Sequence, residues 1–143
     1  MTSLQASCVA IDGRGLLILG EPGSGKSSLA LALIDRGATL VGDDGIEVRG
    51  NAGMLYASPH PRTRGLLEVR NLGLLDYPVA EMIPIAIALR LDPGAERFVE
   101  QAESIGIAGV GLPLVRLWPD GAVLALKAEL ALRRYGLPLS RTS

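Results

Sequence analysis

An α/β fold is predicted for this chain by three features of its sequence. A short apolar run at residues 16–19 leads directly into a glycine-rich loop, and helix-forming residues follow from 27 to 36. Other apolar and β-branched runs are separated by short glycine turns, which is typical of antiparallel strands. Residues 122–135 have the spacing of an amphipathic helix. Hairpins combined with a strand-loop-helix unit indicate an α/β domain.

Length and composition favour one globular domain covering residues 1–143. Apolar residues make up 48% and charged residues 20%, and the net charge is -1. This balance predicts no broad attraction to nucleic acid or to a membrane surface. No stretch approaches the roughly 20 apolar residues that span a bilayer, and the start lacks a leader pattern. We expect a cytoplasmic protein in which the single Cys8 is a buried, reduced thiol.

The elements can be placed along the chain from the apolar runs and the turn residues. We predict a hairpin of strands 7–11 and 16–19, turning at 12–15, and a helix over 27–36 that ends before Gly37. Further strands are expected over 39–42, 46–49, 54–57, 66–75 and 83–91, with 46–49 and 54–57 forming a second hairpin across 50–53. Helices are expected over 95–105 and 122–135. Trp118 and the leucines of the last helix are expected in the core.

The loop between the second strand and the first helix carries the strongest functional signal. Gly20, Gly25, Lys26 and Ser27 match the pattern G-x-x-x-x-G-K-[ST], in which backbone amides wrap phosphates, lysine neutralises charge and serine ligates magnesium. Lysine suits this place because its compact ammonium fits among backbone amides, and only Lys26 and Lys127 are lysines beside twelve arginines. The alternative is a glycine-rich turn with an incidental lysine. The predicted nucleotide-binding residues are Gly20, Glu21, Pro22, Gly23, Ser24, Gly25, Lys26, Ser27 and Ser28.

Two adjacent carboxylates, Asp43 and Asp44, follow the next predicted strand. They are expected at the same sheet edge as the glycine loop, which is where open α/β sheets place ligands. Side chains alternate along a strand, so one carboxylate should face the phosphates, where it could serve a metal or take a proton. Since Gly42 and Gly45 flank the pair, a simple turn is the alternative.

Three further polar residues are candidate site residues or have a polar side chain near the predicted strands. Glu68 and Arg70 are two apart in a predicted strand, so both should point to one face, either toward the nucleotide or as a solvated ion pair. His60 lies between two prolines without metal-ligand companions, which predicts a surface loop.

Three segments, GEPGSGKS, GDDG and GLLEVRNLGLLD, together resemble the bacterial HPr kinase/phosphorylase family, particularly its catalytic domain. The third segment resembles the family signature, with Asn71 where glycine is usual. The resemblance implies a phosphoenolpyruvate-carboxykinase-like P-loop domain, with a mixed sheet flanked by helices. It implies a serine kinase that uses ATP and Mg²⁺ to phosphorylate HPr or a related phosphocarrier protein of the phosphotransferase system, with a possible homo-oligomeric state.

The same resemblance implies roles for individual residues. Lys26 would bind phosphate oxygens, and Asp43 would be the acid/base toward the serine hydroxyl. Arg70 would stabilise charge on the phosphoryl group in flight. The metal would be held by Ser27, Asp44 and Glu68, with Asp44 also counted among the catalytic residues together with Asp43 and Arg70.

The chain also departs from the family pattern. It is similar to the short form that lacks the usual N-terminal domain. Gln5 stands at the place of a usual histidine, and Gly45 where arginine is common, which implies feeble phosphorolysis, the reverse activity. Pro113 and Arg116 are similar to a family segment that contacts substrate. A small-metabolite kinase and a non-catalytic nucleotide-sensing module remain the alternative functions.

Overall fold

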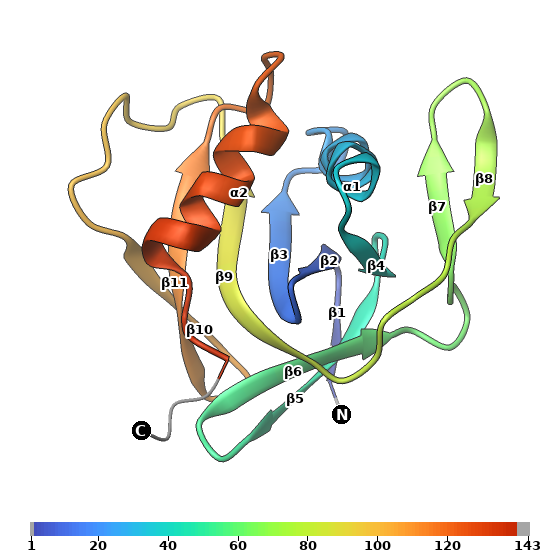
Figure 1. The fold of residues 1–143 in the computed structure, drawn as a ribbon, viewed down its shortest axis with the longest axis horizontal. Coiled ribbons are helices and arrows are strands. Elements are labelled where there is room, and N and C mark those ends of the chain that lie inside the picture. The colour runs from blue at the N-terminus through green and yellow to red at the C-terminus, as the bar shows by residue number, and fades with distance from the viewer. Residues whose placement is uncertain (1, 140–143) are drawn as a thin grey trace.

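The computed structural model describes residues 2–139 and shows a mixed sheet with two helices on one face (Figure 1). The predicted α/β fold with a mixed sheet is therefore confirmed. The elements in chain order are β1 (Thr2–Leu4), β2 (Ser7–Ile11), β3 (Arg14–Gly20), α1 (Lys26–Asp35), β4 (Thr39–Gly42), β5 (Ile46–Asn51), β6 (Met54–Pro59), β7 (Leu66–Val69), β8 (Gly73–Asp76), β9 (Ile83–Leu91), β10 (Glu103–Ile107), β11 (Val110–Leu117) and α2 (Leu124–Tyr135).

Strand β9 is the centre of the sheet. It pairs in parallel with β3 on one side and with β11 on the other, and its first residues pair antiparallel with β6, which continues to β5 and β1. Strand β2 lies antiparallel between β3 and β4. Strands β3, β4, β9 and β11 therefore all run in the same direction, and their carboxyl ends meet at one edge.

Two apolar layers cover the two faces of this sheet. Because side chains alternate along a strand, Leu16 and Ile18 of β3 pack under the helices, whereas Leu17 and Leu19 pack toward β5 and β6. Cys8 belongs to the second layer, as expected for a buried thiol, and burial raises its pKa to about 12. The thiol is therefore protonated at neutral pH and serves as a small core residue.

Three tight hairpins share one turn geometry. Asp12–Gly13, Ala52–Gly53 and Ala108–Gly109 each separate directly paired strand residues, and both residues of each turn have positive φ values. Two-residue turns of this type match the right-handed twist of the flanking strands. The first two hairpins were predicted, whereas the third, between β10 and β11, was missed.

The prediction of one strand over residues 66–75 is wrong, because the segment folds back on itself. Strands β7 and β8 form a separate two-stranded hairpin, which stands to one side in Figure 1. Asn71 lies in the turn with φ 73°, and the Leu72 N–H donates to the Val69 carbonyl at 3.0 Å. Asparagine tolerates this left-handed conformation better than most residues, so Asn71 can stand where the resembling family has glycine.

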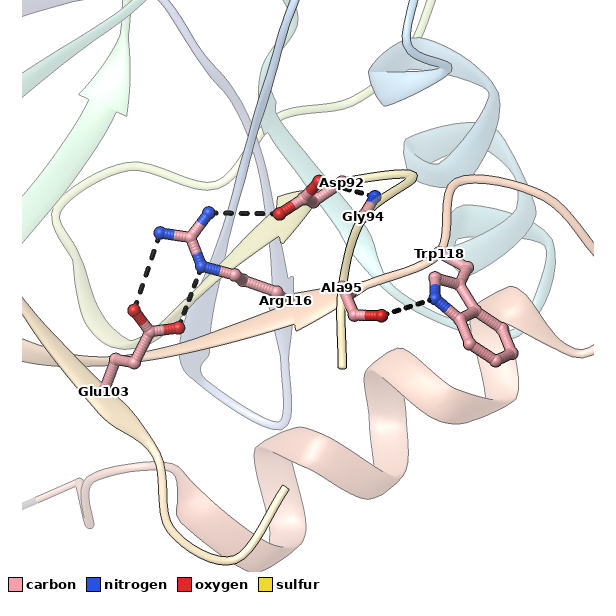
Figure 2. Close-up of polar contacts among 6 residues, drawn as sticks. All are labelled: Asp92, Gly94, Ala95, Glu103, Arg116 and Trp118. Carbon is pink, nitrogen blue, oxygen red and sulfur yellow. Dashed lines mark hydrogen bonds and ion pairs between the residues drawn. The ribbon is translucent and has the colours of Figure 1, made fainter. Parts of the chain in front are cut away.

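The predicted helix over residues 95–105 is also wrong. The chain is irregular after β9, and β10 then pairs with β11, a strand that was not anticipated. Figure 2 shows what holds this segment: Arg116 donates to Asp92 at 3.2 Å and to Glu103 at 2.9 Å, while Asp92 accepts from the Gly94 N–H at 2.8 Å. These tertiary contacts replace the local hydrogen bonds of a helix.

The expected core role of Trp118 and of the last helix's leucines is only partly right. Trp118 is 44% exposed, because it follows β11 at the sheet edge. In α2, Leu132 is 2% exposed, but Leu126 and Leu130 face outward. Neither of the helices within residues 2–139 is long and apolar enough to cross a membrane.

Helix α2 should be fastened to the sheet through Leu132. Replacing Leu132 by alanine is expected to lower the free energy of unfolding by about 2–5 kcal/mol, because a buried leucine leaves a cavity. Leu130→Ala on the outer face of the same helix is the matched control, expected to change it by about 0.5 kcal/mol or less. Urea unfolding followed by circular dichroism measures both, and equal losses would contradict this packing.

Candidate active site

The glycine-rich loop lies between the end of β3 and the start of α1. Gly23 and Gly25 have φ values of 80° and 104°, a conformation that residues with a side chain rarely adopt. The first backbone bond of the helix runs from the Leu29 N–H to the Gly25 carbonyl at 3.0 Å. The amides of the first turn therefore point out of the helix end, and this end is suited to bind an anion.

Gly20 is required by close packing inside the loop. A Cβ atom at position 20 would stand 2.5 Å from the Oγ of Ser24. Among the buried side-chain nitrogen and oxygen atoms in the described part of the chain, this Oγ is the one that lacks a hydrogen-bond partner. A side chain at position 20 would therefore require the Ser24 hydroxyl to move and would crowd the Cβ atoms of Ser24 and Leu91.

The Lys26 ammonium is held over the same loop. Its Nζ donates to the carbonyl oxygens of Gly20 at 2.9 Å and Glu21 at 3.2 Å. The positive charge is thus placed beside the exposed amides, where a polyanion would meet both.

The Asp43 carboxylate is the most highly connected polar group near the loop. It is 6% exposed, and its Oδ1 accepts hydrogen bonds from Ser27 Oγ at 2.7 Å and from Ser7 Oγ at 2.8 Å. Its Oδ2 accepts from the Glu68 N–H at 3.1 Å. A carboxylate offers about four lone-pair positions, so these three donors leave one for a further contact.

Ser7 is a site residue that the sequence analysis missed. It is fully buried at the start of β2, and its hydroxyl also accepts from the Asp44 N–H at 3.4 Å. Because β2 runs antiparallel to β3 and β4, its start lies at the edge where they end. The available signal was one hydroxyl residue opening an otherwise apolar strand.

The β7–β8 hairpin brings Glu68 and Arg70 to the loop. Leu67 is fully buried in the apolar layer that includes Leu29 and Leu33 of α1, so the hairpin is packed against this helix. A guanidinium nitrogen of Arg70 lies 4.0 Å from where a Cβ of Gly23 would stand. Both side chains line the cavity beside the loop. Arg70 follows the end of β7, so strand alternation does not place it there.

These residues enclose a cavity of about 250 Å³. It is lined by Pro22, Gly23, Gly25, Lys26, Ser27, Ser28, Asp44, Glu68 and Arg70. Asp43 does not line this cavity but is hydrogen-bonded to Ser27, which does. Gly20, Glu21 and Ser24 belong to the loop but do not line the cavity either. The oxygen atoms of Ser27, Asp44 and Glu68 are ligands that suit Mg²⁺.

Asp43 and Asp44 also line a second cavity, of about 430 Å³, together with Gln5 and His60. Asp44 therefore stands between two cavities. Asp44 is exposed with φ 59°, so the two carboxylates point to different surroundings. His60 follows β6 in an irregular segment, as expected, and its Nδ1 accepts from the Arg62 N–H at 3.2 Å.

Pro113 and Arg116 lie outside both of these cavities. Pro113 is paired with Ser104 within the β10–β11 hairpin, and the Arg116 guanidinium is engaged by Asp92 and Glu103. Within residues 2–139, no three His, Cys, Asp or Glu side chains gather as a metal cluster.

The fold and this cavity define a class of protein: a mixed-sheet α/β protein whose glycine-rich loop and helix start are suited to bind an anion. Residues 1–82 match the family model described as the HPr Serine kinase C-terminal domain. The chain belongs to the HPr serine kinase family, and the resemblance seen in the sequence is confirmed.

Relatives and a solved structure agree with this membership. The chain is 47% identical over 77 residues to the HPr kinase/phosphorylase of Clostridium tetani and 45% over 75 residues to that of Clostridium botulinum. These matches cover 54% and 52% of this chain, but it spans only 25% of each relative. The structure of the Hpr(Ser) kinase/phosphatase from Coxiella burnetii matches with a TM-score of 0.82 and 27% identity, over 93% of this chain and 95% of that one.

Ser7 should stabilise the protein through the Asp43 carboxylate. Ser7→Ala is expected to lower the free energy of unfolding by about 1.5–3 kcal/mol, because a buried charged group loses one of its donors. Ser28→Ala, at an exposed position of α1, is the control and should stay within about 0.5 kcal/mol of the unmodified protein. Urea titration measures both, and a neutral Ser7→Ala would show that the other two donors suffice.

Proposed function

We propose that this protein is an ATP-dependent protein-serine kinase that phosphorylates HPr or a related phosphocarrier of the phosphotransferase system. The observation that carries the proposal is the direct hydrogen bond between Ser27 of the phosphate loop and the buried Asp43. This hydrogen bond places a carboxylate directly beside the helix end that is proposed to bind phosphates. Phosphoryl transfer needs both a phosphate-binding group and a carboxylate that can act on the attacking hydroxyl.

The loop residues are proposed to hold the nucleotide phosphates. The first-turn amides and Lys26 would bind the phosphate oxygens, with the ammonium moving from the loop carbonyls to the more negative ligand. Ser27, Asp44 and Glu68 would hold Mg²⁺, which supplies charge neutralisation between phosphates when bound. The Ser27 hydroxyl donates a hydrogen bond to Asp43, so the lone pairs of its oxygen remain available to bind Mg²⁺.

Asp43 is proposed to accept the proton of the acceptor's serine hydroxyl, with Arg70 stabilising the charge of the phosphoryl group in flight. The three donors hold the carboxylate in one orientation, so little reorganisation is required during the reaction. Burial excludes water from one side of this group, which strengthens its interaction with nearby charges.

The wider proposal follows the family to which the chain belongs. Residues 1–143 are proposed to form one catalytic domain with the phosphoenolpyruvate-carboxykinase-like P-loop fold, acting in the cytoplasm, with a homo-oligomer as a possible assembly. Because Gln5 and Gly45 depart from the family pattern, we propose that phosphorolysis is weak. A small-metabolite kinase or a nucleotide sensor would instead leave HPr-type proteins unphosphorylated.

The test of this function is incubation with labelled ATP, Mg²⁺ and purified HPr-type proteins, followed by detection of phosphoserine. Lys26→Ala is expected to lower kcat/KM by about 10²–10³-fold, the scale for removing one preorganised charge-stabilising group. Arg49→Ala, which removes an exposed cation from β5, is the control with unchanged rate. Nucleotide binding without any phosphoserine would favour the sensor instead.

Substitutions of Asp43 and Asp44 are expected to change different kinetic parameters. Asp43→Asn is expected to keep ATP binding but to lower kcat by about 10²–10⁴-fold, because an amide cannot accept the hydroxyl proton. Asp44→Asn should instead raise the Mg²⁺ concentration needed for half-maximal rate. Steady-state kinetics with calorimetric ATP titration measures both, and a near-normal rate for Asp43→Asn beside an inactive Asp44→Asn would make Asp44 the base.

A further inference from the structure

We propose that the base of the bound nucleotide stacks on Trp118, in a cavity beside the phosphate loop where β9 and β11 end. This inference rests on the proposed nucleotide-dependent function and assigns a second part of the same ligand's site. The cavity is built from residues beyond position 82, where the family match ends.

The direction of the strands decides on which side the base can lie. Strands β3, β9 and β11 are parallel neighbours, so Gly20, Leu91 and Leu117 end at the same edge. Asp43 follows β4, which lies on the other side of β3 beyond β2. The reacting end of the nucleotide belongs on the Asp43 side, and the base then has the β9 and β11 side to occupy.

The chain next to Trp118 borders the phosphate loop directly. The carbonyl oxygen of Pro119 lies 3.9 Å from where a Cβ of Gly25 would stand. On the same side, the Cβ of Leu91 lies 3.4 Å from where a Cβ of Gly20 would stand. The ends of β9 and β11 are therefore adjacent to the loop, within reach of a nucleotide whose phosphates lie on it.

Trp118 is an aromatic surface that is already oriented. Its indole Nε1–H donates to the Ala95 carbonyl at 2.8 Å, as Figure 2 shows, yet the side chain remains 44% exposed. A tryptophan in this state keeps apolar area in water while its rotation is restricted. Stacking of a base would remove that area from water at a small cost in side-chain entropy.

The acceptor for this indole is held by the polar contacts around Arg116. The guanidinium joins Asp92, at the start of the irregular segment, to Glu103, at its end, and Asp92 also binds the Gly94 N–H. Ala95 follows directly, and its N–H donates to the Asp92 carbonyl at 3.1 Å. We assign Arg116 a positioning role: it braces the segment on which the Trp118 ring depends.

The chemistry of the cavity suits a purine nucleotide. It has a volume of about 150 Å³ and is lined by Trp118 with Glu96, Arg97 and Lys127 among others. The Lys127 ammonium lies 5.6 Å from the Trp118 ring centroid, where it can also attract the phosphate nearest the ribose. The Glu96 carboxylate can accept a hydrogen bond from an exocyclic amino group of the base.

The test uses the intrinsic fluorescence of Trp118, which is the only tryptophan in the chain. Titration with Mg²⁺-ATP is expected to change its emission, with a midpoint equal to the Kd from calorimetry. Tripolyphosphate is the control ligand: it carries the phosphates without the base and should bind the loop without changing the emission. ATP binding that leaves the emission unchanged would overturn the stacking proposal while leaving the proposed kinase function intact.

Variants distinguish stacking from an indirect effect. Trp118→Ala should weaken ATP binding about tenfold, the scale of one base stacked on an aromatic ring, and leave tripolyphosphate binding unchanged. Trp118→Phe should retain most of the affinity. Phe98→Ala is the matched control, since this 78% exposed aromatic lies on the same segment but outside the cavity.

Three outcomes would count against the proposal in different ways. Equal weakening of ATP and tripolyphosphate by Trp118→Ala, with Trp118→Phe no better, would mean that the residue only supports the loop. Failure of both ligands to bind the unmodified protein would overturn the stacking proposal together with the nucleotide-dependent function. A Lys26-dependent affinity for ATP combined with no role of Trp118 would refute the stacking alone.

Discussion

The burial of the Asp43 carboxylate is the constraint on which the rest of the site depends. A charge with 6% exposure is stable only when hydrogen bonds replace its water. Here the donors come from three separate elements: Ser7 from β2, Ser27 from α1 and the Glu68 amide from β7. The need to satisfy one carboxylate therefore holds the sheet edge, the phosphate-loop helix and the hairpin in one arrangement.

The same requirement couples stability to function. The hydroxyl that joins α1 to Asp43 belongs to the residue proposed to face the metal and phosphates, so a ligand on the loop acts on a network already joined to the core. Apolar packing supplies the rest of the rigidity, because Leu67 anchors the hairpin beside Leu29 and Leu33 of α1. The Arg70 side chain then extends to the loop from a hairpin that is packed on α1.

The edge of the sheet at which the parallel strands end continues beyond the phosphate loop. The parallel strands all end at one edge of the sheet, and the antiparallel strand β2 begins at the same edge. The proposed nucleotide would lie along this edge, with its reacting end toward Asp43 and its base toward the β9 and β11 termini. Arg116, which is hydrogen-bonded to Asp92 and Glu103, holds the segment after β9 in place. Asp43 has the same role at the other end of this sheet edge.

By itself, the sequence determined the glycine loop, the helix after it, the carboxylates after β4 and the family, because these depend on local patterns and residue chemistry. It also carried an unused signal, since Ala108–Gly109 repeats the turn at Ala52–Gly53 that was predicted. Only the tertiary structure decided that residues 66–75 turn back at Asn71, that 95–105 is not a helix, and that Ser7 reaches Asp43. In each case the observed structure depends on a hydrogen bond or strand pairing that the local hydrophobic periodicity does not specify. Secondary-structure propensity along the chain therefore could not predict these features.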